Sequence, residues 1–75
     1  MLLSYFPDQI SLAGRPIMDK FIRTVSSTDT VVKNSMTADC AIIWSVLWQG
    51  RMLANKKVYE TYTAAKKPIV ILETG

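Results

Sequence analysis

The chain of 75 residues contains no histidine and a single cysteine, Cys40. An intramolecular disulfide is therefore excluded, and a zinc site made of cysteine and histidine lacks its ligands. Catalytic pairs of serine or cysteine with histidine are excluded for the same reason. A lone free thiol fits a reducing compartment, so we expect a cytoplasmic protein that holds no metal and no cofactor.

Sequence motifs for phosphate binding and for ester hydrolysis are also missing. The patterns Gly-x-Gly-x-x-Gly, Gly-x-x-x-x-Gly-Lys-Ser/Thr and Gly-x-Ser-x-Gly do not occur among the three glycines. The sequence therefore names no reaction by itself. Any prediction of a site has to come from the expected topology.

Long apolar runs and blocks of charge are absent as well. The uncharged run at residues 40–50 is shorter than the ~20 residues that span a bilayer, and the start lacks the basic region of a secretory signal. The net charge is +3, and the only basic pairs are Lys56-Lys57 and Lys66-Lys67. We expect no membrane segment and no nucleic-acid partner, because scattered basic residues usually face solvent.

The pattern of apolar residues predicts four strands and two helices. The strands are expected at residues 2–6, 30–33, 40–47 and 69–72, and the helices at 16–25 and from 53 or 55 to 65. Pro16 is expected at the first position of its helix, and Asn55 is a candidate cap of the other. The apolar side of the first helix is expected to consist of Ile17, Met18, Phe21, Ile22 and Val25, and that of the second of Ala54, Val58, Tyr62 and Ala65.

Residues 40–47 are the most apolar stretch, with Ser45 as their one polar member. Continuous hydrophobicity is typical of a parallel strand that is covered on both faces, so this strand is expected at the centre, with Trp44 in the core. Burial should raise the thiol pKa of Cys40, which favours a structural role.

The order β-α-β-β-α-β then predicts one α/β domain with a Rossmann-like, three-layer, mainly parallel arrangement. A ferredoxin-like split β-α-β sheet with an antiparallel half is the alternative.

The last strand, residues 69–72, is apolar, and nothing after it would cover it. An apolar strand at a sheet edge leaves backbone groups unpaired. We therefore expect residues 1–75 to be the N-terminal portion of a longer α/β protein, or a small unit that completes itself by association into a homo-oligomer.

The residues that follow the strands are the candidates for a site. In a parallel sheet the loops that leave the strands share one edge, where ligands bind. The loop after the first strand carries Pro7, Asp8 and Gln9, and the loop after the second carries Lys33, Asn34 and Ser35. Arg51 precedes a helix start, where a guanidinium suits a phosphate or carboxylate. Trp48 could stack on a base or sugar, or could simply pack in the core. Gly50 allows a positive φ angle, and Lys57 is expected only on the outer face of its helix.

The second half of the chain resembles a group of known proteins. The segment "ADCAIIWSVLWQGRMLANKKVYETYTAAKKPIVILETG", residues 38–75, is similar to the first domain of uncharacterised phage and marine-bacterial α/β proteins described as glycosyltransferase-like. In these proteins a strand ending Ile-Trp-Ser precedes a Gly-Arg loop, a Lys/Tyr helix and a "KPIVILE.G" strand. The resemblance implies a Rossmann-like half that forms a sugar-nucleotide cleft together with a second domain.

Two functions follow as expectations. The first is the acceptor-side half-domain of a glycosyltransferase-like enzyme, inactive alone, in which a sugar nucleotide or another phosphate-bearing ligand binds with the help of a second domain. Its substrate-binding residues would be Asp8, Ser45, Trp48, Gln49, Arg51 and Glu73. The alternative is a small non-catalytic module that self-associates or binds a partner through the edge of the last strand.

Overall fold

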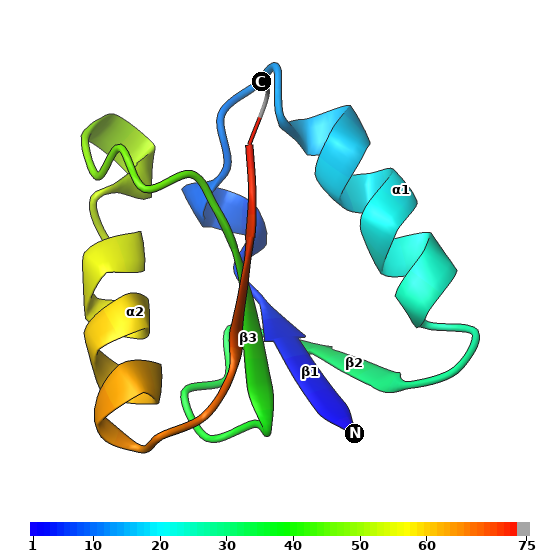
Figure 1. The fold of residues 1–75 in the computed structure, drawn as a ribbon. Helices are drawn as coiled ribbons and strands as arrows, with labels where there is room; N and C mark the ends of the chain where they lie inside the picture. The colour runs from blue at the N-terminus through cyan, green and yellow to red at the C-terminus, as the bar shows by residue number, and fades with distance from the viewer. Residues whose placement is uncertain (74–75) are drawn as a thin grey trace.

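The computed structural model describes residues 1–73, which form a four-stranded, all-parallel sheet with one helix on each face (Figure 1). Thr74 and Gly75, the end of the segment that carries the resemblance, lie outside the described residues. The elements are β1 (Leu2–Tyr5), η1 (Pro7–Gln9), α1 (Arg15–Val25), β2 (Thr30–Lys33), β3 (Cys40–Trp44), η2 (Gly50–Met52), α2 (Asn55–Ala64) and β4 (Ile69–Leu72). The strand order is β2-β1-β3-β4. The predicted Rossmann-like α/β fold is confirmed, and the alternative with an antiparallel half is wrong.

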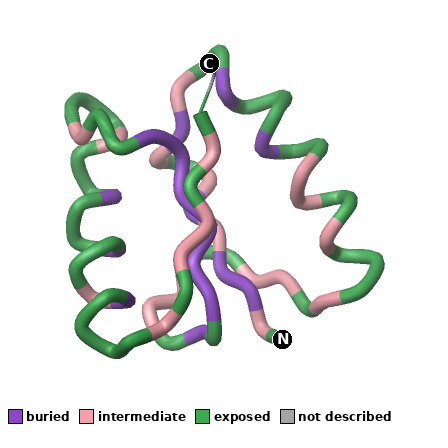
Figure 2. The backbone as a smooth tube through the Cα atoms, in the orientation of Figure 1, coloured by how far each residue is buried: buried purple, intermediate pink, exposed green. Residues whose placement is uncertain are grey.

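β3 is the central strand, as expected, and all five of its residues are buried. Its side chains alternate between two apolar clusters: Ile42 and Trp44 face α1, whereas Ala41 and Ile43 face α2. Figure 2 shows the buried backbone concentrated in β1 and β3, between the two helices. The continuous hydrophobicity of this stretch therefore reflects cover on both faces.

The end of β3 differs from the prediction, because the strand stops at Trp44 and not at residue 47. Ser45 has a φ angle of 68°, in the left-handed region, which turns the chain out of the extended conformation. The Ser45 hydroxyl then accepts a hydrogen bond from the backbone N–H of Leu47 at 2.9 Å. Val46 and Leu47 are exposed, so their apolar character is not a sign of strand structure.

The helices start and end close to the predicted positions, with differences in detail. α1 begins at Arg15, so Pro16 takes the second helical position, and Ile17 is 43% exposed where a core position was expected. Met18 is the fully buried member of the stripe, in one apolar cluster with Ile42 and Trp44 of β3. In α2, Val58 and Tyr62 are buried as predicted, whereas Ala54 and Ala65, at the two ends of the helix, are exposed.

Gly14, just before α1, is required by a close approach. A Cβ atom at this position would overlap the indole ring of Trp44. The missing side chain therefore lets the start of α1 lie directly on the end of β3. This contact holds the loop after β1 against the central strand.

The connection between β2 and β3 contains no helix. Residues 34–39 return from the end of β2 to the start of β3, although crossovers between parallel strands usually take a dozen residues or more. Tyr62 of α2 holds this short crossover: its hydroxyl donates to the carbonyl of Ser35 at 2.8 Å and accepts from the N–H of Ala38 at 3.1 Å. Lys67 also donates to the carbonyl of Ala38, at 2.9 Å. The crossover is thus fixed by α2 and its C-terminal turn.

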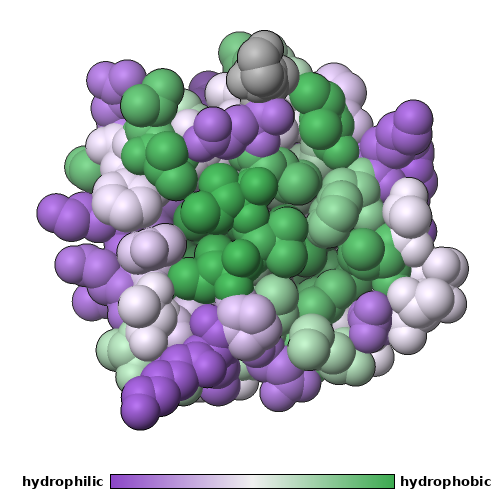
Figure 3. Space-filling model, viewed as in Figure 1, coloured by the Kyte–Doolittle hydropathy of each residue, from purple (hydrophilic) through white to green (hydrophobic). Residues whose placement is uncertain are grey.

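β4 forms one edge of the sheet and, within residues 1–73, pairs only with β3. Three of its four residues are half-buried, and Ile71 is 38% exposed. Figure 3 shows a broad apolar surface over β4, between the two helices. None of the helices in the described part of the chain has the length and hydrophobicity to cross a bilayer.

Candidate functional site

The ends of the four strands define one edge of the molecule, the carboxyl edge, where the η1 and η2 segments lie next to each other. The chain leaves β1 toward the face that α1 covers, and leaves β3 toward the face that α2 covers. The strand order therefore reverses between β1 and β3. In open parallel sheets, ligands bind outside the carboxyl ends of the strands at such a switch point.

Asn55, the first residue of α2, holds the switch point together. Its side chain is fully buried, and its Nδ2 donates to the carbonyls of Trp44 at 2.9 Å and Gln9 at 3.1 Å. Its Oδ1 accepts from Nε2 of Gln9 at 2.9 Å. The expected capping role is wrong, because the side chain makes no cap hydrogen bond to the helix. Asn55 instead joins the loop after β1, the end of β3 and the start of α2.

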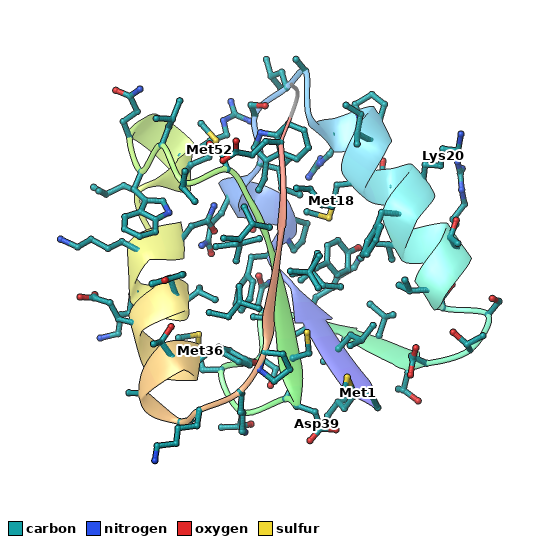
Figure 4. The ribbon with its side chains drawn as sticks, in the orientation of Figure 1. Met1, Met18, Lys20, Met36, Asp39 and Met52 are labelled. Atoms are coloured by element: carbon teal, nitrogen blue, oxygen red, sulfur yellow. The ribbon has the colours of Figure 1, made fainter. Side chains whose placement is uncertain are left out.

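A cavity of about 330 Å³ opens beside this junction, on the face that α2 covers. It lies between the loop after β1, the loop after β2 and the first turns of α2, and its walls are Phe6, Gln9, Asn34, Met36, Ala54, Lys57 and Val58. In Figure 4, Met36 lies toward α2 whereas Met18 lies between the sheet and α1, so the two methionines mark the two faces. The cavity is apolar at its base and has Lys57 as its one charged residue.

The absence of a crossover helix explains why this cavity exists. α2 packs against β3 and β4, and residues 34–39, a loop of successive bends, cover the same face. Phe6 and Val58 are buried at the base, while Lys57 on the rim is exposed. Pockets with an apolar lining and a few convergent polar groups are typical of small-molecule sites, and this volume falls at the lower end of their range.

The six predicted substrate-binding residues all follow strand ends on the carboxyl side, but none lines the cavity. Asp8, Gln49 and Arg51 are exposed, on η1, before η2 and on η2 respectively. Arg51 forms no salt bridge within residues 1–73, so its guanidinium is open to an anion. Ligand contact by these residues stays a prediction.

Ser45 and Glu73, two of the six, have structural partners. The Ser45 hydroxyl closes the turn after β3, and Oε1 of Glu73 accepts a hydrogen bond from the N–H of Val46 at 3.0 Å. These contacts tie the ends of β3 and β4 together. Gly50, between Gln49 and Arg51, has a φ angle of 58°, as its place in a tight turn suggested.

Trp48 is turned toward α2. Its ring lies 5.4 Å from the ring of Tyr59, centre to centre, with an angle of 47° between the planes. This is the packing role that the sequence left open beside a stacking wall for a ligand. Its indole Nε1 is buried and has no hydrogen-bond partner among the described residues. A ligand contact by Trp48 remains a prediction.

The cavity residues were largely missed by sequence reasoning. Gln9 and Asn34 were placed on loops at this edge, but not among the contact residues, and Lys57 was expected only on the outer face of its helix. They come from three separate segments, and the only local signal is their position just after a strand or at a helix start. Their convergence depends on the tertiary structure.

Cys40 lies at the opposite end of β3 and takes no part in this site. Burial raises the pKa of its thiol, an effect that a hydrogen bond with the backbone of Val70 only partly opposes. The thiol donates to the carbonyl of Ala41 at 3.6 Å. A protonated, buried thiol is inert, which agrees with the predicted structural role.

Fold and cavity together define a class: a small α/β domain with a four-stranded parallel sheet of Rossmann-like topology and a ligand-sized cavity near its switch point. Comparisons with protein-family models, with curated proteins and with solved structures found no match. The class therefore rests on the topology, and a more specific function has to be argued from the cavity.

Proposed function

We propose that this chain is a ligand-binding α/β domain that takes a phosphate-bearing small molecule, such as a sugar nucleotide, in the cavity beside the β1–β3 switch point. The observation that carries the proposal is the cavity itself, where the loops after β1 and β2 meet the first turns of α2. This is the edge at which parallel α/β sheets bind nucleotides and related ligands.

The cavity offers different chemistry at its base and at its rim. Phe6, Met36 and Val58 provide apolar and aromatic surface for a sugar or base ring. Lys57 on the rim brings a positive charge, and its position in the first turn of α2 adds the favourable end of the helix dipole. The amides of Gln9 and Asn34 can bind hydroxyl groups. A ring with an attached phosphate uses all three features.

The resemblance of residues 38–75 supports a narrower version of the proposal. In it, the domain is the acceptor-side half of a glycosyltransferase-like enzyme, and a second domain completes the sugar-nucleotide site. Arg51 then serves as a further anion contact on the neighbouring part of the carboxyl edge, where it is exposed and free of salt bridges within residues 1–73.

The proposal is tested by titrating the 75-residue chain with a nucleotide sugar, a free sugar and inorganic phosphate, followed by calorimetry or NMR chemical shifts. Lys57→Ala should weaken binding of the phosphate-bearing ligand about tenfold, the effect of one charge-assisted contact worth ~1.5 kcal/mol. Lys56→Ala is the matched control, because Lys56 is an exposed neighbour that does not line the cavity.

The outcomes separate the two versions. An effect of Lys57→Ala but not of Lys56→Ala supports the cavity, and an additional effect of Arg51→Ala extends the site along the carboxyl edge. Equal binding by wild type and Lys57→Ala, or chemical shifts confined to residues outside the cavity, would contradict the proposal.

A further inference from the structure

The open edge of β4 presents a row of backbone groups that the sheet does not use. The carbonyls of Pro68 and Leu72 accept hydrogen bonds from the N–H groups of Ala41 and Ser45, at 3.2 and 2.8 Å, so these residues direct their backbone groups toward β3. Backbone groups alternate between the two sides of a strand. Ile69 and Ile71 therefore point their N–H and C=O groups away from β3, toward the open side.

β4 also lacks most features that normally protect an edge strand. Natural edges often carry charged side chains, bulges or a proline that removes an outward N–H. The four residues of β4 are aliphatic. Pro68 sits just before the strand, at a position whose backbone faces β3, so its missing N–H leaves the outer row of donors intact. The apolar surface in Figure 3 lies over this unprotected edge.

We propose that two copies of this chain pair through β4, antiparallel and about a two-fold axis at Val70, to form one continuous sheet. In this register Ile69 of each copy lies opposite Ile71 of the other, and each such pair exchanges both of its N–H···O bonds. The register uses every outward group of both isoleucines. Isologous pairing of this kind closes at the dimer.

The distribution of charge around β4 supports a second copy of the chain as the partner at this edge. The segment that contains β4 is basic before the strand, at Lys66 and Lys67, and acidic after it, at Glu73. Antiparallel pairing about Val70 places Glu73 of each copy opposite Lys67 of the other, and side chains at these positions project from the same face. Each group keeps capacity for this contact: Oε2 of Glu73 is not used by Val46, and the Lys67 ammonium has three donors. A parallel partner strand would set like charges side by side.

The mass of the 75-residue chain in solution, measured by light scattering over a concentration series, tests the proposal. We expect a monomer–dimer equilibrium that stops at the dimer. Amide hydrogen exchange should show that protection of Ile69 and Ile71 rises with protein concentration, whereas Val70 and Leu72, bonded to β3, are protected throughout. A chain that stays monomeric at millimolar concentration, or that assembles past the dimer, overturns the proposal.

Charge exchange provides the sharper test. Glu73→Lys and Lys67→Glu should each weaken the dimer about tenfold, since each places like charges opposite one another. The double variant Lys67→Glu/Glu73→Lys should recover most of that loss. The intramolecular bonds of both residues, to Val46 and Ala38, stay broken in the double variant, so recovery cannot come from the fold of the single copy. Absence of recovery overturns this register.

Ile71→Pro tests the backbone contacts. It removes an outward N–H from each copy without touching the bonds to β3, and should weaken the dimer on the order of a hundredfold. Leu12→Lys is the control for an exposed apolar residue outside the paired strand, because Leu12 is 77% exposed and lies in the loop before α1. Circular dichroism and melting check that each variant is folded. A folded Ile71→Pro variant with unchanged dimerisation, or a similar loss in Leu12→Lys, places the interface elsewhere and overturns the proposal.

Discussion

The layer between α1 and the sheet consists of apolar side chains, whereas the layer between α2 and the sheet also contains buried polar groups. On the α1 side, Met18 is fully buried among residues such as Ile42 and Trp44. On the α2 side, the largest fully buried side chains include Tyr62 and Asn55, which bond to backbone groups of the loops. The difference shows how the connections are held. α1 covers its face of the sheet by hydrophobic contact. On the other face, hydrogen bonds from Tyr62 and Asn55 fix the loops next to α2.

The most severe test places a charge on each face of the central strand. Ile42 faces α1 and Ile43 faces α2, and both are almost completely buried. Ile42→Asp and Ile43→Asp should each abolish folding, because an unpaired buried charge costs several kcal/mol. Circular dichroism and thermal melting measure this loss.

Val46→Asp is the control for that experiment. Val46 was predicted in the same strand but is 46% exposed after the turn at Ser45, so its substitution should leave the melting transition nearly unchanged. A folded Ile43→Asp variant would contradict the placement of this residue in the core. An unfolded Val46→Asp variant would show that β3 continues past Trp44.

The next test compares an apolar replacement in the α1 layer with the removal of a buried hydrogen-bonding side chain in the α2 layer. Met18→Leu keeps an apolar side chain of similar volume in the α1 layer and should cost about 1 kcal/mol or less. Asn55→Leu removes the bonds to Trp44 and Gln9 and leaves buried carbonyls without donors, which should cost about 3 kcal/mol. Urea unfolding of both variants measures the difference. Similar losses for the two would mean that the Asn55 bonds contribute little beyond packing.

A smaller loss than that of Asn55→Leu is expected at the crossover. Tyr62→Phe keeps the ring but removes the hydroxyl that bonds Ser35 and Ala38, and should lower the free energy of unfolding by about 1–2 kcal/mol. Tyr59→Phe is the matched control on the exposed side of the same helix, with an expected change within about 0.5 kcal/mol. Amide exchange should quicken at Ala38 in the first variant alone. Equal effects of the two substitutions would remove the special role of the crossover bonds.

Much of the fold was predictable because it depends on local patterns. The strands at residues 30–33 and 69–72 have the predicted bounds, and the apolar periodicity of residues 18–25 and 58–62 identified the inner faces of both helices. The unbroken hydrophobicity of β3 indicated a central parallel strand. The end of β3 was wrong because an apolar run does not reveal a positive φ angle at Ser45.

The candidate site was less accessible to sequence reasoning. The carboxyl edge follows from the order of the elements, and Gln9 and Asn34 were placed there. The cavity depends in addition on Met36 and Lys57. Met36 lies in the connection between β2 and β3, which contains no helix, and Lys57 lies on α2, which packs beside that connection. Nothing in the residues next to Lys57 distinguishes it from Lys56. Only the packing of α2 against the crossover places one of the two lysines on the cavity rim.

The sequence by itself determined which apolar residues form the inner faces of the helices and the central strand. It also determined the order of helices and strands and excluded histidine chemistry and an intramolecular disulfide. These properties reside in residue type and spacing, which act over a few turns of helix or a few residues of strand. The tertiary structure alone decided where the polar groups find partners. Asn55 bonds a residue 46 positions away, and Tyr62 bonds one 27 positions away, because a buried polar group must be satisfied by whichever backbone group the fold brings within reach.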